Sequence, residues 1–414
     1  MLFVLTSRQC ESHMISYRDA LDLMLSTTRP LGTEPVPLTA ASHRVLATAL
    51  VAPHDMPPFD QSLMDGYALR SADTRAAMPQ HPVRLSVGQT LTAGDVLDYA
   101  VLSQQAIRIM TGATMPRGVD AVVKLEDSEV KDGRLFIRQP VWRGTSVQRR
   151  GAEVRRGSLL APVGTRLTPQ CIGMALSLGL DTAEVTQRPR LALVAPGDEL
   201  LPPGAPLQPG KKWCSNLYAL ELRAQEVGAA SVNAGIVPDT LAALAERLLQ
   251  NLGADVIVIL GASGRGDHDY AARAMLEVGA EVMFRGVATS PGRSITVAQY
   301  QQTLLVGLPG SPFAAFVGFE VFVWPVLRAL LGQKPILPPT LKATLTVPVR
   351  LRRGATHFLP ARVQPSIDGC QVTPCTTLVD LARTETEALG LIIAPSHRRA
   401  LPAGTPVRVQ VLTA

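Results

Sequence analysis

The sequence predicts a multidomain protein of the α/β plus β class, and three patterns along the chain carry that prediction. Between about residues 35 and 190, short apolar runs are closely punctuated by Pro and Gly, which favours small, mostly antiparallel sheets. From residue 191, apolar runs alternate with helical spacing, which predicts a three-layer α/β domain with helices on both faces of its sheet. After residue 340, β-runs and turn residues return, which predicts a small all-β domain.

Length and composition exclude several classes of protein. The chain has 414 residues, enough for about two to four domains, and its 18% charged and 46% hydrophobic residues exclude a disordered chain. A net charge of +6 fits an anionic small substrate as well as it fits nucleic acid, and the charge alone decides nothing. Only 4% of residues are aromatic, which argues against recognition of stacked bases across a wide surface, and we expect no nucleic-acid partner. Five cysteines without a Cys-x-x-Cys pair predict a reducing compartment, which we take to be the cytoplasm.

The first half of the chain has few predicted helices. Helical apolar spacing begins after Ser16, a plausible N-cap with Asp19 at the capping-box position, and Pro30 ends the helix. Strands are then expected at residues 83–87, 121–124 and 134–137, followed by a helix at 169–178.

The second half alternates strands and helices. Strands are predicted at residues 191–194, 231–237, 255–260 and 303–306, and helices at 217–226, 240–252, 270–277 and from Pro312 onward. The apolar stretch 313–331 contains Glu320, Pro325 and Arg328, so we expect a buried helix and no membrane span. Residues 333–339 are typical of a linker into the final β-domain.

Four loops that follow the α/β strands are rich in glycine, acid or proline, and they span residues 196–200, 237–239, 261–269 and 307–312. In open α/β sheets, ligands bind beyond the carboxyl ends of the strands. Glycines let backbone N–H groups approach phosphate oxygens, and carboxylates suit Mg²⁺. We therefore expect a phosphate-binding site at this edge, while His268 is either a metal ligand or a solvent-facing loop residue.

One local pattern favours a different function. Residues 256–266, the following helix and Glu281 resemble a dinucleotide-binding βαβ unit, with Glu281 about where a ribose-binding acid belongs. The glycine spacing is GxxGxG, however, where the fingerprint has GxGxxG, and the strand is the third of its domain. An NAD(P)-binding oxidoreductase is the remote alternative.

A longer string covers residues 58–68, Pro-Phe-Asp-Gln-Ser-Leu-Met-Asp-Gly-Tyr-Ala, and local structure alone does not explain it. It resembles the signature of the molybdopterin molybdenumtransferase family, which includes MoeA and the E domain of gephyrin. Further matching segments follow in family order: 108–113, 149–151, 197–200, 215–216, Asp239, 266–270, 291–292, 307–312 and 401–407. The resemblance runs from about residue 15 to the end of the chain.

The resemblance implies four domains. An α/β molybdopterin-binding domain would comprise residues 14–34 and 189–337, and a small linking domain would comprise 35–53 and 157–188. A β-rich domain would be inserted at 54–156, and a β-barrel-like domain would close the chain at 338–414. The resemblance also implies a homodimer whose active site lies between the α/β domain of one subunit and the inserted domain of the other.

The implied reaction takes adenylylated molybdopterin and molybdate, uses Mg²⁺, and yields molybdenum cofactor and AMP. Asp65, Thr111 and Asp269 would be catalytic, and Glu199, Asp239 and Asp269 would bind the metal. The residues that would bind substrate are Glu199, Asp239, Ser290, Arg293, Gly310, Pro312, Arg149 and Glu153.

The chain departs from the family pattern where an anion would bind. Lys-Pro-Gly-Lys-Pro is replaced by Ser290-Pro-Gly-Arg-Ser294, an upstream lysine by Gly286, and a frequent aspartate by Cys214. An acidic pair is reduced to Glu153, and a C-terminal Gln-Gly-Ser motif is missing. Because lost lysines weaken binding of an anion, a second function stays open: a catalytically impaired paralogue that carries molybdopterin or its cofactor to a molybdoenzyme or another biosynthetic protein.

Overall fold

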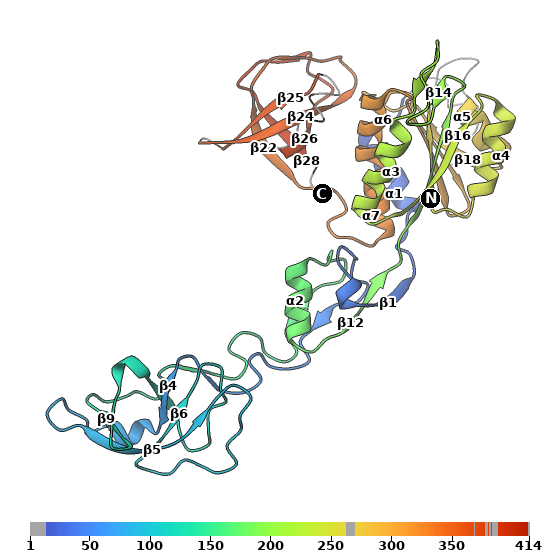
Figure 1. The fold of residues 1–414 in the computed structure, drawn as a ribbon. Helices are drawn as coiled ribbons and strands as arrows, with labels where there is room; N and C mark the ends of the chain where they lie inside the picture. The colour runs from blue at the N-terminus through green and yellow to red at the C-terminus, as the bar shows by residue number, and fades with distance from the viewer. Residues whose placement is uncertain are drawn as a thin grey trace.

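The computed structural model describes residues 14–261, 270–367, 369–376, 380, 382 and 388–412. The chain is elongated (Figure 1), with an α/β unit and a C-terminal barrel at one end and an inserted β unit at the other. A small linking unit lies between them. The fold is the multidomain α/β plus β class that the sequence predicts.

The α/β unit is built on a six-stranded sheet in the order β16-β13-β17-β21-β20-β18. Its strands are β13 (Arg190–Pro196), β16 (Ala230–Val237), β17 (Val256–Leu260), β18 (Glu281–Arg285), β20 (Thr296–Tyr300) and β21 (Thr303–Leu308). The first three and β21 are parallel, whereas β20 runs antiparallel to both of its neighbours. The predicted strands are present, and the β18–β20 edge is additional to them.

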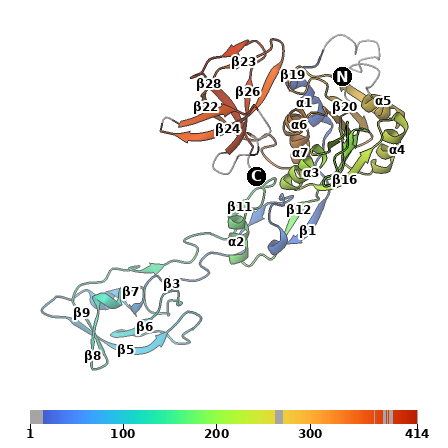
Figure 2. The ribbon, with the colours of Figure 1, turned by 45° about the horizontal axis from the view of Figure 1, so that its top comes forward.

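Helices cover both faces of this sheet (Figure 2), which makes the predicted three layers. They are α1 (Tyr17–Thr27), α3 (Asn216–Val227), α4 (Leu241–Asn251), α5 (Tyr270–Glu277), α6 (Pro312–Gly318) and α7 (Trp324–Leu330), with a π-helical segment (Phe319–Val323) joining the last two. Helices α1, α3, α6 and α7 share one hydrophobic core, and α4 and α5 share the other.

Two polar details explain where these helices lie. The Ser16 hydroxyl accepts a hydrogen bond from the Asp19 N–H (3.2 Å), so α1 begins with the predicted cap. In the π-helical segment Glu320 is completely buried, and its carboxylate accepts a hydrogen bond from Arg223 Nε (2.6 Å). The Arg223 guanidinium also lies 3.9 Å from the centre of the Trp324 ring, so a cation–π contact joins α3 to the start of α7.

Within the described residues, one helix (Pro312–Leu330) is long and apolar enough to cross a membrane, and 83% of its apolar window is buried inside the protein. Such burial is typical of the core helix of a globular domain. It agrees with the expectation of a buried helix, which came from the charged residues that interrupt this apolar stretch.

The linking unit and the inserted unit are both dominated by short strands. The linking unit pairs β1 (Thr33–Pro37) with β12 (Thr182–Thr186) and β2 (Leu50–Val51) with β11 (Leu159–Ala161), and it adds α2 (Pro169–Ser177).

The inserted unit has a sheet in the order β7-β4-β6-β5-β9-β8. Those strands are β4 (Gly66–Leu69), β5 (Val83–Leu91), β6 (Gln105–Ile109), β7 (Ala121–Lys124), β8 (Glu129–Lys131) and β9 (Arg134–Ile137), and β3 (Gln61–Ser62) pairs with β10 (Val147–Gln148) beside them. Short 3₁₀ turns lie at Leu38–Ala40, Ser71–Thr74 and Leu125–Asp127.

The C-terminal unit is a five-stranded barrel in the order β24-β25-β22-β28-β26. The first and last strands of this order, β24 and β26, also pair with each other, which closes the barrel. Its strands are β22 (Thr340–Leu345), β24 (Thr356–Ser366), β25 (Gly369–Pro374), β26 (Ala388–Ala394) and β28 (Pro406–Val411). A short pair, β23 (Val349–Arg350) and β27 (Ala400–Leu401), flanks it. Strand β19 (Thr289–Ser290) leaves the α/β unit and pairs with β24.

The register of β18 contradicts the dinucleotide-binding alternative. Glu281 is opposite Gln299, which is opposite Leu304, which is opposite Val256 at the start of β17. Glu281 therefore lies at the amino-terminal edge of the sheet, whereas Gly261 follows the carboxyl end of β17. A ribose-binding acid must lie at the same edge as the glycines, so Glu281 cannot take that role.

Candidate functional site

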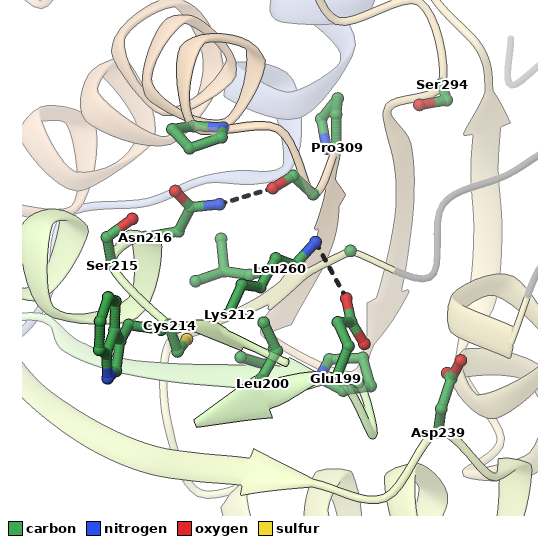
Figure 3. Close-up of a pocket in the computed structure, with 17 residues that line it drawn as sticks. Glu199, Leu200, Lys212, Cys214, Ser215, Asn216, Asp239, Leu260, Ser294 and Pro309 are labelled. Carbon is green, nitrogen blue, oxygen red and sulfur yellow. Dashed lines mark hydrogen bonds and ion pairs between the residues drawn. The ribbon is translucent and has the colours of Figure 1, made fainter. Parts of the chain in front are cut away.

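A cavity of about 430 Å³ opens at the carboxyl ends of the parallel strands. Strand β13 is followed in the chain by β16, which lies on one side of it in the sheet, and then by β17, which lies on its other side. The cavity therefore lies at the topological switch point of the sheet. Its lining comes from all four predicted loops and from the start of α3 (Figure 3). The lining residues are Ala195, Pro196, Gly197, Glu199, Leu200, Lys212, Trp213, Cys214, Ser215, Asn216, Asp239, Leu260, Gly261, Ser294, Pro309, Gly310 and Pro312.

Two glycines let the loops after β17 and β21 approach each other. Gly261 has φ of +105°, which side chains rarely adopt, and its N–H donates to the Leu308 carbonyl (2.9 Å). A Cβ on Gly310 would lie 3.5 Å from the Gly261 Cα. Bare backbone at this place leaves room for a ligand against the floor of the cavity.

Acidic side chains stand at one side of the cavity. The Glu199 carboxylate pairs with the Lys212 ammonium (Nζ to Oε1, 3.1 Å), and Asp239 also lines the cavity (Figure 3). The backbone N–H of Asp239 donates to Asp198 Oδ1 (3.2 Å), which holds the two loops together. Asp269, the third predicted metal ligand, lies outside the described residues, as does His268.

The donor set agrees with a Mg²⁺ that is completed by substrate. Among the described residues, no three His, Cys, Asp or Glu side chains gather closely enough to hold a metal by themselves. Mg²⁺ usually binds one or two carboxylates together with substrate phosphates and water. Glu199 and Asp239 provide two hard oxygen donors in one cavity, so the residues present fit that ion.

Helix N-termini supply the complementary positive potential. Asn216, the first residue of α3, donates from Nδ2 to the Gly310 carbonyl (2.8 Å), which joins the start of α3 to the loop before α6. Helix α6 begins at Pro312 in the same lining. The helix dipole favours an anion at both places.

A small flap borders the cavity next to α3. It consists of β14 (Leu200–Leu201) paired with β15 (Lys212–Trp213). Cys214 follows β15 and is buried, and burial raises the pKa of its thiol, so the sulfur is protonated at neutral pH. A neutral thiol makes this wall of the cavity less acidic than the aspartate that the family resemblance led us to expect there.

The predicted anion loop is divided between cavities. Ser294 lines the main cavity, but Ser290 and Arg293 do not. Arg293 directs Nε to the Met14 sulfur (3.1 Å) and lines a neighbouring cavity of about 440 Å³. That second cavity also contains Arg352 and Arg353 of the barrel, so three arginines meet there.

Ser290 borders this arginine cavity and also a mainly apolar one of about 410 Å³ that contains Phe313 and Cys375. Sequence reasoning missed Arg352 and Arg353, although the basic run 350–353 was a visible signal.

Asp65 and Thr111, both predicted to be catalytic, are in direct contact on the inserted unit. Asp65 Oδ1 accepts hydrogen bonds from the Thr111 hydroxyl (2.7 Å) and from its backbone N–H (2.8 Å). The bond from the Thr111 hydroxyl, and after it the bond from the backbone N–H, hold the pKa of Asp65 below its ordinary value. The exposed carboxylate therefore stays charged.

Arg149 and Glu153 lie where the inserted unit joins the linking unit. Arg149 pairs with Asp60 (2.6 Å), and the Gln148 amide donates to Glu153 (2.7 Å). Both residues belong to the unit that lies at the far end of the chain from the α/β cavity (Figure 1). One subunit therefore carries two separate groups of predicted residues.

Comparisons with known proteins cover almost the whole chain. Residues 15–179 match the family described as "MoeA N-terminal region (domain I and II)", and residues 192–329 match "Probable molybdopterin binding domain". The chain is 33% identical to molybdopterin molybdenumtransferase of Bacillus subtilis over 92% of its length and 90% of that protein's. It is 36% identical to the Nostoc protein of that name over 77% of this chain and 75% of the other. A MoeA structure from Pyrococcus horikoshii superposes with a TM-score of 0.84 at 28% identity, covering 97% of this chain and 100% of that one.

Proposed function

Because the chain belongs to the MoeA family of molybdopterin molybdenumtransferases, we propose that it inserts molybdate into adenylylated molybdopterin and releases AMP. Its place is in molybdenum cofactor biosynthesis, and its class is that of a transferase. The observation that carries the detailed proposal is the switch-point cavity, in which carboxylates, bare glycine backbone and two helix N-termini face one space. Cleavage of a pyrophosphate linkage needs this combination.

Each side of the cavity would bind a different part of the nucleotide. The N-termini of α3 and α6 would bind the phosphates, with Gly310 and Pro312 holding the backbone that approaches them. Glu199 and Asp239, together with Asp269, would hold Mg²⁺, which when bound neutralises phosphate charge. Lys212 would hold the Glu199 carboxylate in place through their ion pair.

Molybdate, the second substrate, is an oxyanion and would bind near the barrel. Arg293 shares its cavity with Arg352 and Arg353, and Ser290 borders it. This supports an anion site whose charge comes from arginines of two units, in place of the family's lysines. Arginine suits a planar, bidentate contact and replaces a lysine incompletely.

The inserted unit would act on the partner subunit of a homodimer. Asp65 directly precedes β4, and Thr111 lies two residues after β6. These strands lie far from α3 and α6 of their own chain (Figure 1), so a second copy would have to bring the two residues to the cavity. Arg149 and Glu153 would approach the substrate from the same side. A cytoplasmic location remains a prediction.

The test supplies purified protein with adenylylated molybdopterin, Mg²⁺ and molybdate, and measures AMP release by chromatography. The proposal expects AMP and molybdenum incorporation that both depend on Mg²⁺, and loss of both in Glu199→Gln. Glu246→Gln, an exposed acid in the middle of α4 that does not line the cavity, is the control and should keep full activity.

The carrier function is favoured by one observation, the absence of Ser290 and Arg293 from the main cavity. A carrier would bind molybdopterin species without releasing AMP under any molybdate concentration. That result would replace the enzyme with a binding protein.

A further inference from the structure

Trp213 is the one aromatic residue among the described residues that line the main cavity. It ends β15, immediately before the buried Cys214 and the start of α3. The side chain is 49% exposed, although large apolar side chains are normally covered. A half-exposed indole at the rim of a substrate cavity presents apolar, aromatic surface that a ligand can cover.

The indole is held in place before any ligand binds. Its Nε1–H donates to the Ala205 carbonyl (2.9 Å), so the polar atom of the ring is already paired within the protein. Trp213 pairs with Leu201 across β14 and β15, and the following N–H, of Cys214, donates to the Leu201 carbonyl (2.8 Å). A fixed ring loses little conformational freedom when a planar group stacks on it.

The position of Trp213 relative to α3 is also informative. Only Cys214 and Ser215 separate it from Asn216, the first residue of the helix, so the Cα atoms of Trp213 and Asn216 lie within about 11 Å of each other. Both residues line the same cavity. The helix N-terminus favours phosphate, and the indole favours a flat heterocycle. A nucleotide-like substrate carries both groups, and they are joined by one sugar.

We propose that Trp213 binds the planar heterocycle of the substrate, adenine or pterin, by stacking. This inference rests on the proposed function and assigns one specificity residue within its cavity. The opposing explanation is purely structural, since Trp213 could serve only to fold the flap over residues 202–211 through its bond to Ala205. The two explanations differ in whether ligand affinity depends on the ring.

Tryptophan fluorescence measures the proposed contact directly. The chain has three tryptophans: Trp324 is packed under Arg223, and Trp142 is 79% exposed on the inserted unit. We expect AMP or 6-hydroxymethylpterin to quench the emission of the wild type, and expect Trp213→Phe to remove that quenching. Trp142→Leu, which changes an exposed tryptophan outside this cavity, should leave the quenching in place.

Affinity then tests the energy of the stack. Trp213→Leu should weaken binding of the stacked ligand by roughly tenfold, as loss of one base–aromatic stack does, and Trp213→Phe should weaken it much less. Ribose 5-phosphate lacks a base, so its affinity should be equal in all three proteins. A loss confined to AMP assigns the ring to adenine, and a loss confined to the pterin assigns it to the pterin.

Two results would overturn the inference. One is equal affinity of wild type and Trp213→Leu for both ligands, combined with a lower unfolding temperature, which would mean that the ring only supports the flap. The other is a loss of ribose 5-phosphate binding as large as that of AMP, which would mean a general distortion of the cavity. If the wild type binds no nucleotide and no pterin, the proposed function itself fails, and this outcome is distinct from both.

Discussion

At the residue scale, the order of strands in the sheet decides which of the predicted side chains share a cavity. Glu199, Asp239, Gly310 and Pro312 line one cavity because all of them follow parallel strands, a rule that needs no coordinates. The rule does not extend to Ser290 and Arg293, since which side of a loop a residue faces depends on its backbone torsions. The nearby β19, which pairs with the barrel, turns this loop toward a different cavity.

A first prediction concerns the Asp65–Thr111 contact. Thr111→Val removes the hydroxyl donor and should raise the pKa of Asp65 toward its ordinary 3.8. A carboxyl whose pKa is depressed by folding stabilises the protein above its unfolded-state pKa, and this contribution disappears as the pH falls through the folded-state pKa. The stability difference between the two proteins should therefore be present at neutral pH and vanish well below pH 3.8. Carboxyl NMR titration and denaturant unfolding measure both effects.

The inserted unit contains a matched control for this variant. Asp95 accepts hydrogen bonds from the Thr92 hydroxyl (2.8 Å) and backbone N–H (2.7 Å) in the same way. Thr92→Val should raise the pKa of Asp95 and leave AMP release unchanged, whereas Thr111→Val should slow AMP release as well. Equal activities of the two variants would remove Asp65 and Thr111 from the proposed site.

A second residue-scale prediction concerns the missing lysines. Ser290→Lys would place an ammonium beside the arginine cavity, and a charged hydrogen bond to an anion is worth about 1.5–3 kcal/mol. We expect molybdenum incorporation at low molybdate to rise roughly tenfold. Ser366→Lys, at the far end of β24, adds the same charge elsewhere and should change nothing. A wild type that is already saturated at micromolar molybdate would show that the arginines suffice.

Backbone geometry argues against Gly286→Lys, although the family resemblance led us to expect lysine at this position. Gly286 has φ of +77°, and an added Cβ would lie 3.4 Å from the Arg293 carbonyl. A side chain at this position is strained in the present backbone.

At the element scale, periodicity located the helices and the parallel strands, and it failed at the antiparallel edge. Residues 281–285 contain an apolar run of only three residues between two charged ones, which is too short to predict a strand. Their pairing with β20 is a long-range choice that a local window cannot reveal. Closure of the barrel through β24 and β26 is hidden from the sequence for the same reason.

The prediction at this scale tests the contact between α3 and the π-helical segment. Glu320→Ala leaves Arg223 without its buried partner, and removal of one partner of a buried pair costs about 3–5 kcal/mol. Glu226→Ala removes the second, exposed partner of Arg223 and should cost about 1 kcal/mol or less. Urea unfolding of the two variants gives the comparison. Similar losses would mean that burial does not distinguish the two carboxylates.

At the scale of the whole molecule, composition and spacing predicted separate β-rich and α/β parts, but only the family resemblance predicted an insertion within an interrupted domain. Helix α1 packs beside α7, and Leu21 and Met24 are buried in the α/β core, even though residues 28–323 separate the two helices in the sequence. Contacts of that sequence separation leave no local signal. The distance in space between the inserted unit, which carries Asp65, and the α/β unit likewise depends on how the whole chain folds.

The proposed shared site predicts complementation between two inactive variants. Asp65→Asn and Glu199→Gln should each be inactive alone. A mixed dimer would contain one intact site, formed by the α/β unit of the Asp65→Asn subunit and the inserted unit of the Glu199→Gln subunit. With random exchange of subunits, activity should return to about a quarter of the wild-type value. A mixture of Asp65→Asn with Thr111→Val, both on the inserted unit, should gain nothing. Exchange without recovery, or a fully active monomer in sedimentation, would contradict the shared site.

The separation of α1 from the rest of its core has a consequence for synthesis on the ribosome. Helix α1 emerges first, but the sheet that covers its apolar face begins at β13, and α7 emerges later still. During that delay the linking and inserted units can complete their own cores, while Leu21 and Met24 have nothing native to contact. The nascent chain therefore leaves the apolar face of α1 uncovered until the α/β unit is synthesised, and a chaperone that shields residues 17–27 during that interval would prevent their aggregation.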